Sequence, residues 1–110
     1  MITDNGILYI EPKRYCSKKP VIDIFTKKMT AAYNKAVPCK DRYRGVHRCS
    51  CGVTSENYDV VLSNGEQTNS LCIHYLAYHR DEVSEEQLSK VMSLNDGEVI
   101  PTELDMKKGR

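Results

Sequence analysis

A chain of 110 residues, 40% of them apolar, is long enough for one folded domain and too short for two. No apolar stretch reaches the length of a membrane-spanning helix, and a net charge of +1 excludes a strongly acidic or basic chain. Residues 1–10 lack the basic start and the long apolar run of a secretory signal, so we expect a cytoplasmic protein with reduced thiols.

The charges are divided unevenly along the chain. Residues 1–48 carry 11 Lys and Arg against 4 Asp and Glu, whereas residues 49–110 carry 5 against 11. A basic N-terminal half favours a polyanionic partner, either a nucleic-acid backbone or an acidic protein surface. The charges could equally meet where the two halves fold against each other, or simply face solvent.

The first part of the chain predicts a strand and then a helix. Residues 7–10 (Ile-Leu-Tyr-Ile) have the character of a strand that stops at Pro12, and a basic loop follows over 13–19. Pro20 opens a helical pattern that Pro38 ends. The apolar positions of that helix are expected in the core rather than around a cofactor, and they are Ile22, Phe25, Met29, Ala32, Tyr33 and Ala36.

A second basic run, residues 40–48, interleaves arginines with Tyr43 and His47. Arginine and tyrosine side chains together suit nucleic-acid backbones and stacked bases. They suit an exposed loop before a metal site equally well. The candidate binding residues of this run are Arg42, Tyr43, Arg44 and Arg48.

The middle of the chain predicts a β-hairpin around a cysteine knuckle. Strands over 45–49 and 58–62 would flank the knuckle at 49–52 and a polar turn at 54–57. Residues 63–65 (Ser-Asn-Gly) then form a turn, because Asn and Gly tolerate positive φ.

Two helices are predicted after this turn. Good N-cap residues at 68–70 precede a helix over 71–80. A capping-box pattern at 84–87 starts the second helix, which the Asn-Asp-Gly sequence at 95–97 closes. The last residues contain Pro101 and read as extended or loosely ordered.

Two cysteines and two histidines carry the clearest chemical signal. Cys49 and Cys51 lie one residue apart, and His74 and His79 lie on one predicted helix. Thiolate and imidazole are ligands of tetrahedral zinc sites, and Gly52 supplies the small residue that a knuckle needs. Five residues turn an ideal helix by about 500°, which leaves the two imidazoles about 140° apart. Both can reach one metal only if the last turn of the helix loosens.

The order of knuckle, strand and helix over residues 45–80 resembles the ββα zinc-finger domains that bind zinc with two cysteines and two histidines. Leu71-x2-His74-x4-His79 is similar to the helix of those domains. The resemblance implies a zinc ion held by the two cysteines and two histidines named above. The spacing departs from the family, because one residue separates the cysteines and 22 separate the second cysteine from the first histidine. DNA binding is not implied, since the helix is too apolar to lie in a major groove.

Other residues offer alternatives to this ligand set. His47 alternates with the two cysteines and would face the same way in a regular strand, and Cys72 shares the helix with His74. We expect His47 to be a half-exposed strand residue and Cys72 to be a small buried one. No role is predicted for the two remaining cysteines, Cys16 and Cys39.

The sequence therefore predicts a small single-domain α+β fold. Residues 1–100 would form a zinc-binding domain with its metal core at about 45–80, and residues 101–110 would form a flexible tail. An N-terminal strand and helix would pack on the hairpin-and-helix core, followed by a C-terminal helix. Four protein ligands make a zinc site structural, so we expect a binding or regulatory module whose basic N-terminal face contacts an acidic protein or a nucleic-acid backbone.

Three alternatives stay open. In a zinc hydrolase, water would replace one ligand, with Asp81 or Glu82 as general base and Arg80 stabilising an anion. A metal-free thiol or redox protein would use the same cysteines. A metal-free core with hydrogen-bonded histidines would need no cofactor at all.

Overall fold

The computed structural model describes residues 6–10, 12, 13, 17–39, 48–56 and 58–107, and in this part of the chain the longest helix is α1 (Ile24–Lys35). Its N-cap is Asp23, whose carboxylate accepts hydrogen bonds from the amides of Phe25 and Thr26 at 3.1 and 3.4 Å. The hydroxyl of Thr26 in turn accepts from the Asp23 amide at 2.8 Å. This reciprocal capping sets the start of the predicted helix at Asp23 rather than at Pro20.

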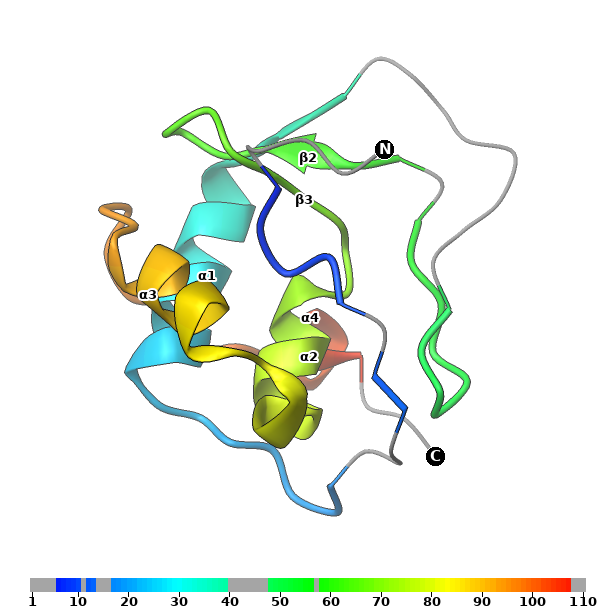
Figure 1. Cartoon of the computed structure of the whole chain (residues 1–110). Helices are drawn as coiled ribbons and strands as arrows, with labels where there is room; N and C mark the ends of the chain where they lie inside the picture. Colours follow the sequence, from blue (N-terminus) through cyan, green and yellow to red (C-terminus); the bar gives the residue numbers. More distant parts are fainter. Residues whose placement is uncertain (1–5, 11, 14–16, 40–47, 57, 108–110) are drawn as a thin grey trace.

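Three short strands form an antiparallel sheet in the order β1–β2–β3. They are β1 (Val37–Pro38), β2 (Val60–Val61) and β3 (Gln67–Thr68). The tight hairpin between β2 and β3 contains Gly65 at a φ of 89°, a conformation that glycine adopts without strain (Figure 1). The sequence did not predict this hairpin, in which β2 pairs with β3 on one side and with β1 on the other.

The predicted strand over residues 7–10 is wrong. Gly6 makes a single parallel bridge with Gln67, and the backbone then turns at Leu8, which has a φ of 58°. The Leu8 amide donates to the side chain of Gln87 at 2.7 Å instead of to a neighbouring strand. Ile7 and Leu8 are nevertheless completely buried, so the apolar run serves the core without forming a strand.

The strand predicted over 45–49 falls mostly outside the described residues. Arg48 forms an isolated antiparallel bridge with Thr54, which closes the loop around the cysteine knuckle. The rest of that prediction, residues 45–47, is not described by the structure.

The second helix, α2 (Cys72–Tyr78), lies at the centre of the fold. All seven of its residues are buried. It packs against α1 on one side and against α4 (Glu103–Met106) on another, while α1 also packs against α3 (Glu85–Met92), as Figure 1 shows. The predicted helices over 71–80 and from Ser84 onward are thus confirmed, with a short 3₁₀ helix, η1 (Arg80–Glu82), between them.

The N-terminal segment docks on α2 through its backbone. The amide of Ser17 donates to the carbonyl of Tyr78 at 2.9 Å, and the amide of Val21 donates to that of Ala77 at 2.8 Å. These bonds bring the loop before α1 against the helix that contains His74 and ends at His79.

The C-terminal residues differ from the predicted flexible tail over 101–110. Within the described part, up to residue 107, they form α4, a single helical turn capped reciprocally by Thr102 and Asp105. Met106 is buried against the core while Leu104 is exposed. Local capping and one anchoring side chain therefore fix a segment whose sequence is too short to show helical periodicity.

The whole is a small α+β domain with helices and a three-stranded antiparallel sheet, as the sequence predicts. Its hydrophobic core joins α1, α2 and α3 to the buried knuckle cysteines. None of the helices in the described residues is long and apolar enough to cross a membrane.

Candidate metal centre

The four predicted ligands lie together in the structure. One ligand atom from each of Cys49, Cys51, His74 and His79 falls within 4.8 Å of all the others. The Sγ atom of Cys49 is 3.0 Å from Nε2 of His79, and that of Cys51 is 3.3 Å from Nε2 of His74. All four side chains are buried. Residues separated by up to 30 positions thus converge on one point.

The knuckle that carries the two cysteines is a tight turn. The amide of Cys49 donates to the carbonyl of Val53 at 2.8 Å, and the amide of Gly52 donates to that of Cys49 at 2.9 Å. Gly52 has a φ of 94°, in the left-handed region where a side chain would be strained. The predicted role of Gly52 is confirmed, because the turn brings both sulfur atoms to the same side.

The end of α2 loosens where the spacing of the histidines requires it. His79 has a φ of −126° and a ψ of 35°, so it lies outside the helix as its C-cap, and its amide still donates to Tyr75. The ring centroids of His74 and His79 are 5.0 Å apart. The departure from helical geometry at one residue thus brings together two imidazoles that an ideal helix would separate.

The dimensions of the cluster fit a tetrahedral ion. Zinc–sulfur bonds of about 2.3 Å and zinc–nitrogen bonds of about 2.0 Å place neighbouring ligand atoms roughly 3.3–3.8 Å apart. The sulfur–nitrogen distances of 3.0 and 3.3 Å are at or slightly below this range, and no pair exceeds 4.8 Å. Two sulfur and two nitrogen atoms are also the donor set that zinc favours. The cluster could therefore hold a metal ion with small side-chain adjustments.

The outer nitrogen of each imidazole has its own acceptor. Nδ1 of His74 lies 3.0 Å from the backbone oxygen of Met106, and Nδ1 of His79 lies 3.3 Å from a carboxylate oxygen of Glu82. A carbonyl and a carboxylate can only accept, so both Nδ1 atoms carry the proton. Both Nε2 lone pairs therefore face the sulfur atoms, which is the tautomer that a metal ligand needs.

Burial controls the protonation of these groups. It lowers the pKa of His74 to about 4, with a further contribution from the neighbouring His79, and it lowers the pKa of His79 against the opposing effect of Glu82. Burial also raises the pKa of the Cys49 thiol to about 11. The histidines are thus neutral and ready to bind a cation, whereas the thiol must lose a proton when it does so.

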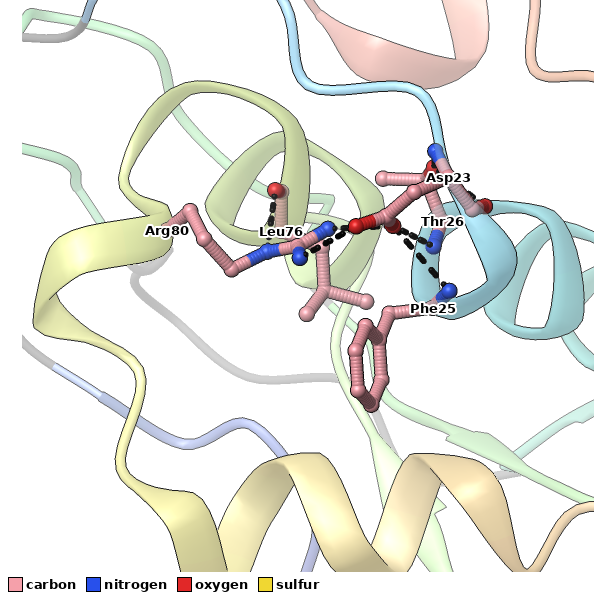
Figure 2. A network of polar contacts seen from close by, with 5 residues as sticks. All are labelled: Asp23, Phe25, Thr26, Leu76 and Arg80. Carbon is pink, nitrogen blue, oxygen red and sulfur yellow. Dashed lines mark hydrogen bonds and ion pairs between the residues drawn. The ribbon is translucent and has the colours of Figure 1, made fainter.

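An ion pair next to the cluster fixes the end of α2. The guanidinium of Arg80 donates two hydrogen bonds of 2.7 Å to the carboxylate of Asp23, and its Nε donates to the carbonyl of Leu76 at 3.0 Å (Figure 2). It also lies 5.1 Å from the ring centroid of Phe25. Because Arg80 follows His79 directly, these contacts connect a candidate ligand to the N-cap of α1.

Two of the three groups that the hydrolase alternative uses, Arg80 and Glu82, are engaged in other contacts. Arg80 is bound by Asp23 and by Leu76. One carboxylate oxygen of Glu82 contacts His79, and the other accepts from the amide of Lys13 at 2.7 Å. A pocket of about 220 Å³ lies beside these residues, lined by Ser17, Val21, Tyr78, His79, Arg80, Asp81 and Glu82. Arg80 and Glu82 thus support the fold around the cluster, whereas Asp81, the other predicted base, is exposed.

The remaining candidates lie apart from the cluster or outside the described residues. Cys72 is completely buried in the core and does not belong to the cluster, in agreement with its expected role. Arg48 is exposed. The predictions that fall outside the described residues concern Cys16, Arg42, Tyr43, Arg44 and His47.

Sequence reasoning missed the outer partners of the two histidines. The spacing of His79 and Glu82, three residues apart, was the available signal for one of them. The contact of His74 with the backbone carbonyl of Met106 could not be predicted, because a backbone group leaves no signal in the sequence.

Comparison of the chain with protein-family models, curated proteins and solved structures found no match.

Proposed function

We propose that this chain is a small zinc-binding module in which the metal site is structural. Cys49, Cys51, His74 and His79 would be the four ligands, and the domain would act as a binding or regulatory module in the cytoplasm. The observation that carries the proposal is the convergence of two thiols and two Nε2 lone pairs within 4.8 Å.

The burial of the cluster supports a structural site over a catalytic one. The exposed fractions are 2% for Cys49, 8% for Cys51, 0% for His74 and 3% for His79. A catalytic zinc site keeps one position open for water or substrate, whereas a structural site is closed by four protein ligands. Four buried ligands leave little access for a substrate.

The connectivity supports the same conclusion. The ligands connect the knuckle to α2. The knuckle is a loop closed by one isolated β-bridge, whereas all residues of α2 are buried. Structural zinc in small peptides contributes roughly 10 kcal/mol or more of folding free energy. A domain of this size gains most from such a link because its core is limited.

The proposed partner is polyanionic. Lys13, Lys18, Lys19 and Arg48 are exposed, and they belong to the half of the chain with the basic excess. They would contact an acidic protein surface or a nucleic-acid backbone, together with Arg42, Tyr43 and Arg44. Such contacts are weakened by salt, since they depend on unscreened charge.

Removal of metal tests the structural role. Purified protein treated with a strong chelator should unfold at a markedly lower temperature, and added zinc should restore the original transition. An unfolding temperature that does not change in chelator would contradict the proposal.

A binding assay tests the partner. Affinity for a single-stranded oligonucleotide and for an acidic peptide is measured at low and moderate salt, for wild type and for Arg42→Glu/Arg44→Glu/Arg48→Glu. The proposal expects binding that falls steeply with salt and disappears in the triple variant. Binding to neither probe, or equal binding by wild type and variant, would contradict the proposed binding of a polyanion by the basic residues.

A further inference from the structure

The C-terminal helix contacts one of the candidate metal ligands. The Nδ1–H group of His74 donates to the carbonyl of Met106, 32 positions away in the chain, and Met106 ends α4. The ring of His74 therefore links two partners at its opposite edges. Nε2 faces the metal cluster, and Nδ1 holds the last residue of α4.

Apart from this hydrogen bond, α4 is attached by its packing against α2. The helix has four residues, of which only Met106 is buried, and Leu104 is 84% exposed. A helix of this length is not stable by itself in water. The C-cap of α4, Lys107, has a φ of 50°, a left-handed conformation that is unfavourable for residues other than glycine. Its ammonium group lies 3.7 Å from Glu56 and 3.3 Å from the hydroxyl of Ser70, contacts that are individually weak near a surface.

The two edges of the His74 ring influence each other. An imidazole that shares its Nε2 lone pair with a cation becomes a better donor at Nδ1, and an acceptor at Nδ1 makes Nε2 a better ligand. Binding at one edge therefore favours binding at the other, and the factor is the same in both directions.

We propose that metal binding at the cluster controls the docking of α4, so that the C-terminal helix is docked in the metal-bound protein and released in the metal-free protein. The proposal rests on the metal site proposed above and adds its regulation. Release would uncover Met106 and the surface of α2 that α4 covers. The domain would thereby present a different surface to a partner according to its metal content.

The test weakens α4 from a position far from the ligands. Thr102 is exposed, and its hydroxyl accepts from the amide of Asp105 at 3.1 Å as the N-cap of α4. Thr102→Ala removes this cap without touching the core. Ser84→Ala is the matched control, because Ser84 caps α3 in the same way and α3 carries none of the four ligands. Zinc affinity of each full-length variant is measured by competition with a chromophoric chelator.

The proposal expects Thr102→Ala to weaken zinc binding by about fivefold, the factor by which loss of such a cap shifts a helix equilibrium, and Ser84→Ala to have a smaller effect. Equal weakening in both variants would show that zinc is coupled only to global folding and would overturn the proposal. Unchanged affinity in Thr102→Ala would overturn it as well, because α4 would then be docked equally with and without metal.

A second set of variants tests the docking of α4 without changing its N-cap. Met106→Ala should weaken zinc binding by more than Leu104→Ala, since only Met106 anchors the helix. Met106→Leu should restore most of the lost affinity. In the wild type, hydrogen exchange of residues 102–107 should accelerate on chelation before that of α1 does. Absence of zinc from the wild type would instead contradict the proposed function itself, so the two failures are distinguishable.

Discussion

Arg80 and Asp23, which are 57 positions apart, form a bidentate ion pair with both hydrogen bonds at 2.7 Å (Figure 2). Each partner has a second role. Asp23 caps the start of α1, and Arg80 donates to Leu76 near the end of α2. Since His79 precedes Arg80, the pair fixes the backbone at a candidate ligand by reference to another helix.

Arg80→Lys should destabilise the domain although it keeps the charge. Lysine cannot make two parallel bonds to one carboxylate and also reach the carbonyl of Leu76. We expect a loss of about 1 kcal/mol in the free energy of unfolding, a modest value because the Asp23 carboxylate is 39% exposed. Urea denaturation of zinc-loaded protein measures it. Arg48→Lys, at an exposed arginine, is the control, and equal stability of the two variants would show that the bidentate geometry contributes nothing.

Glu82→Ala should weaken zinc binding while leaving all four ligands in place. Glu82 orients His79 through its outer nitrogen, and the loss of such outer partners lowers metal affinity by about tenfold or more. The measurement is the dissociation constant in a chelator competition assay. The control is Glu86→Ala, on the exposed side of the next helix. A dissociation constant that changes no more than in the control would mean that His79 is positioned without Glu82.

Cys72→Ala should keep the metal and Cys51→Ser should lose it. Both cysteines are buried, but only Cys51 belongs to the cluster. We expect Cys72→Ala to retain one zinc per chain and to lose about 1 kcal/mol of stability from reduced packing. Elemental analysis combined with thermal unfolding separates the two effects. Loss of zinc from Cys72→Ala would assign that thiol a role as ligand.

Zinc binding at pH 7 should release a proton from the Cys49 thiol and none from His74. The raised pKa of Cys49, about 11, keeps that thiol protonated in the absence of metal, whereas the pKa of His74, about 4, keeps the imidazole neutral. Affinity should fall by about tenfold per pH unit for each proton released as the pH decreases. Calorimetric titration in buffers with different ionisation enthalpies counts these protons. A count of zero would show that the Cys49 thiol is already ionised.

The lowered pKa of His74 also affects stability in acid. Its folded pKa lies below the 6.5 of an unperturbed imidazole, so protonation favours the unfolded chain. The contribution of neutral His74 is complete above pH 6.5 and is lost as the pH falls toward 4. Metal-free protein should therefore lose stability through this interval.

The sequence predicted the parts of the fold that local chemistry determines. The apolar spacing and the flanking prolines indicated α1, and the serine of the capping pattern does cap α3, where Ser84 accepts from the Gln87 amide. The cluster of four candidate ligands followed from residue type and order, and Gly52 has the positive φ of a tight turn at the knuckle. For the two helices and the knuckle, the signal lies within a few neighbouring residues.

Tertiary contacts explain what the sequence did not show. The apolar run at 7–10 fails to form a strand because the Leu8 amide bonds to Gln87, a residue 79 positions away. The strands β1 and β3 have two residues each and one contains a proline, so neither shows alternation. α4 is held by the buried side chain of Met106 and by the hydrogen bond between the Met106 carbonyl and His74. A sequence of four residues contains no pattern that predicts either contact.

The most direct test of the central claim is the metal content of purified, untagged protein by elemental analysis. The wild type should contain one zinc per chain, and Cys51→Ser and His79→Ala should contain none and unfold at lower temperature. A wild type that is folded and stable without any bound metal would contradict the claim, and the four buried side chains would then be a hydrogen-bonded part of the core.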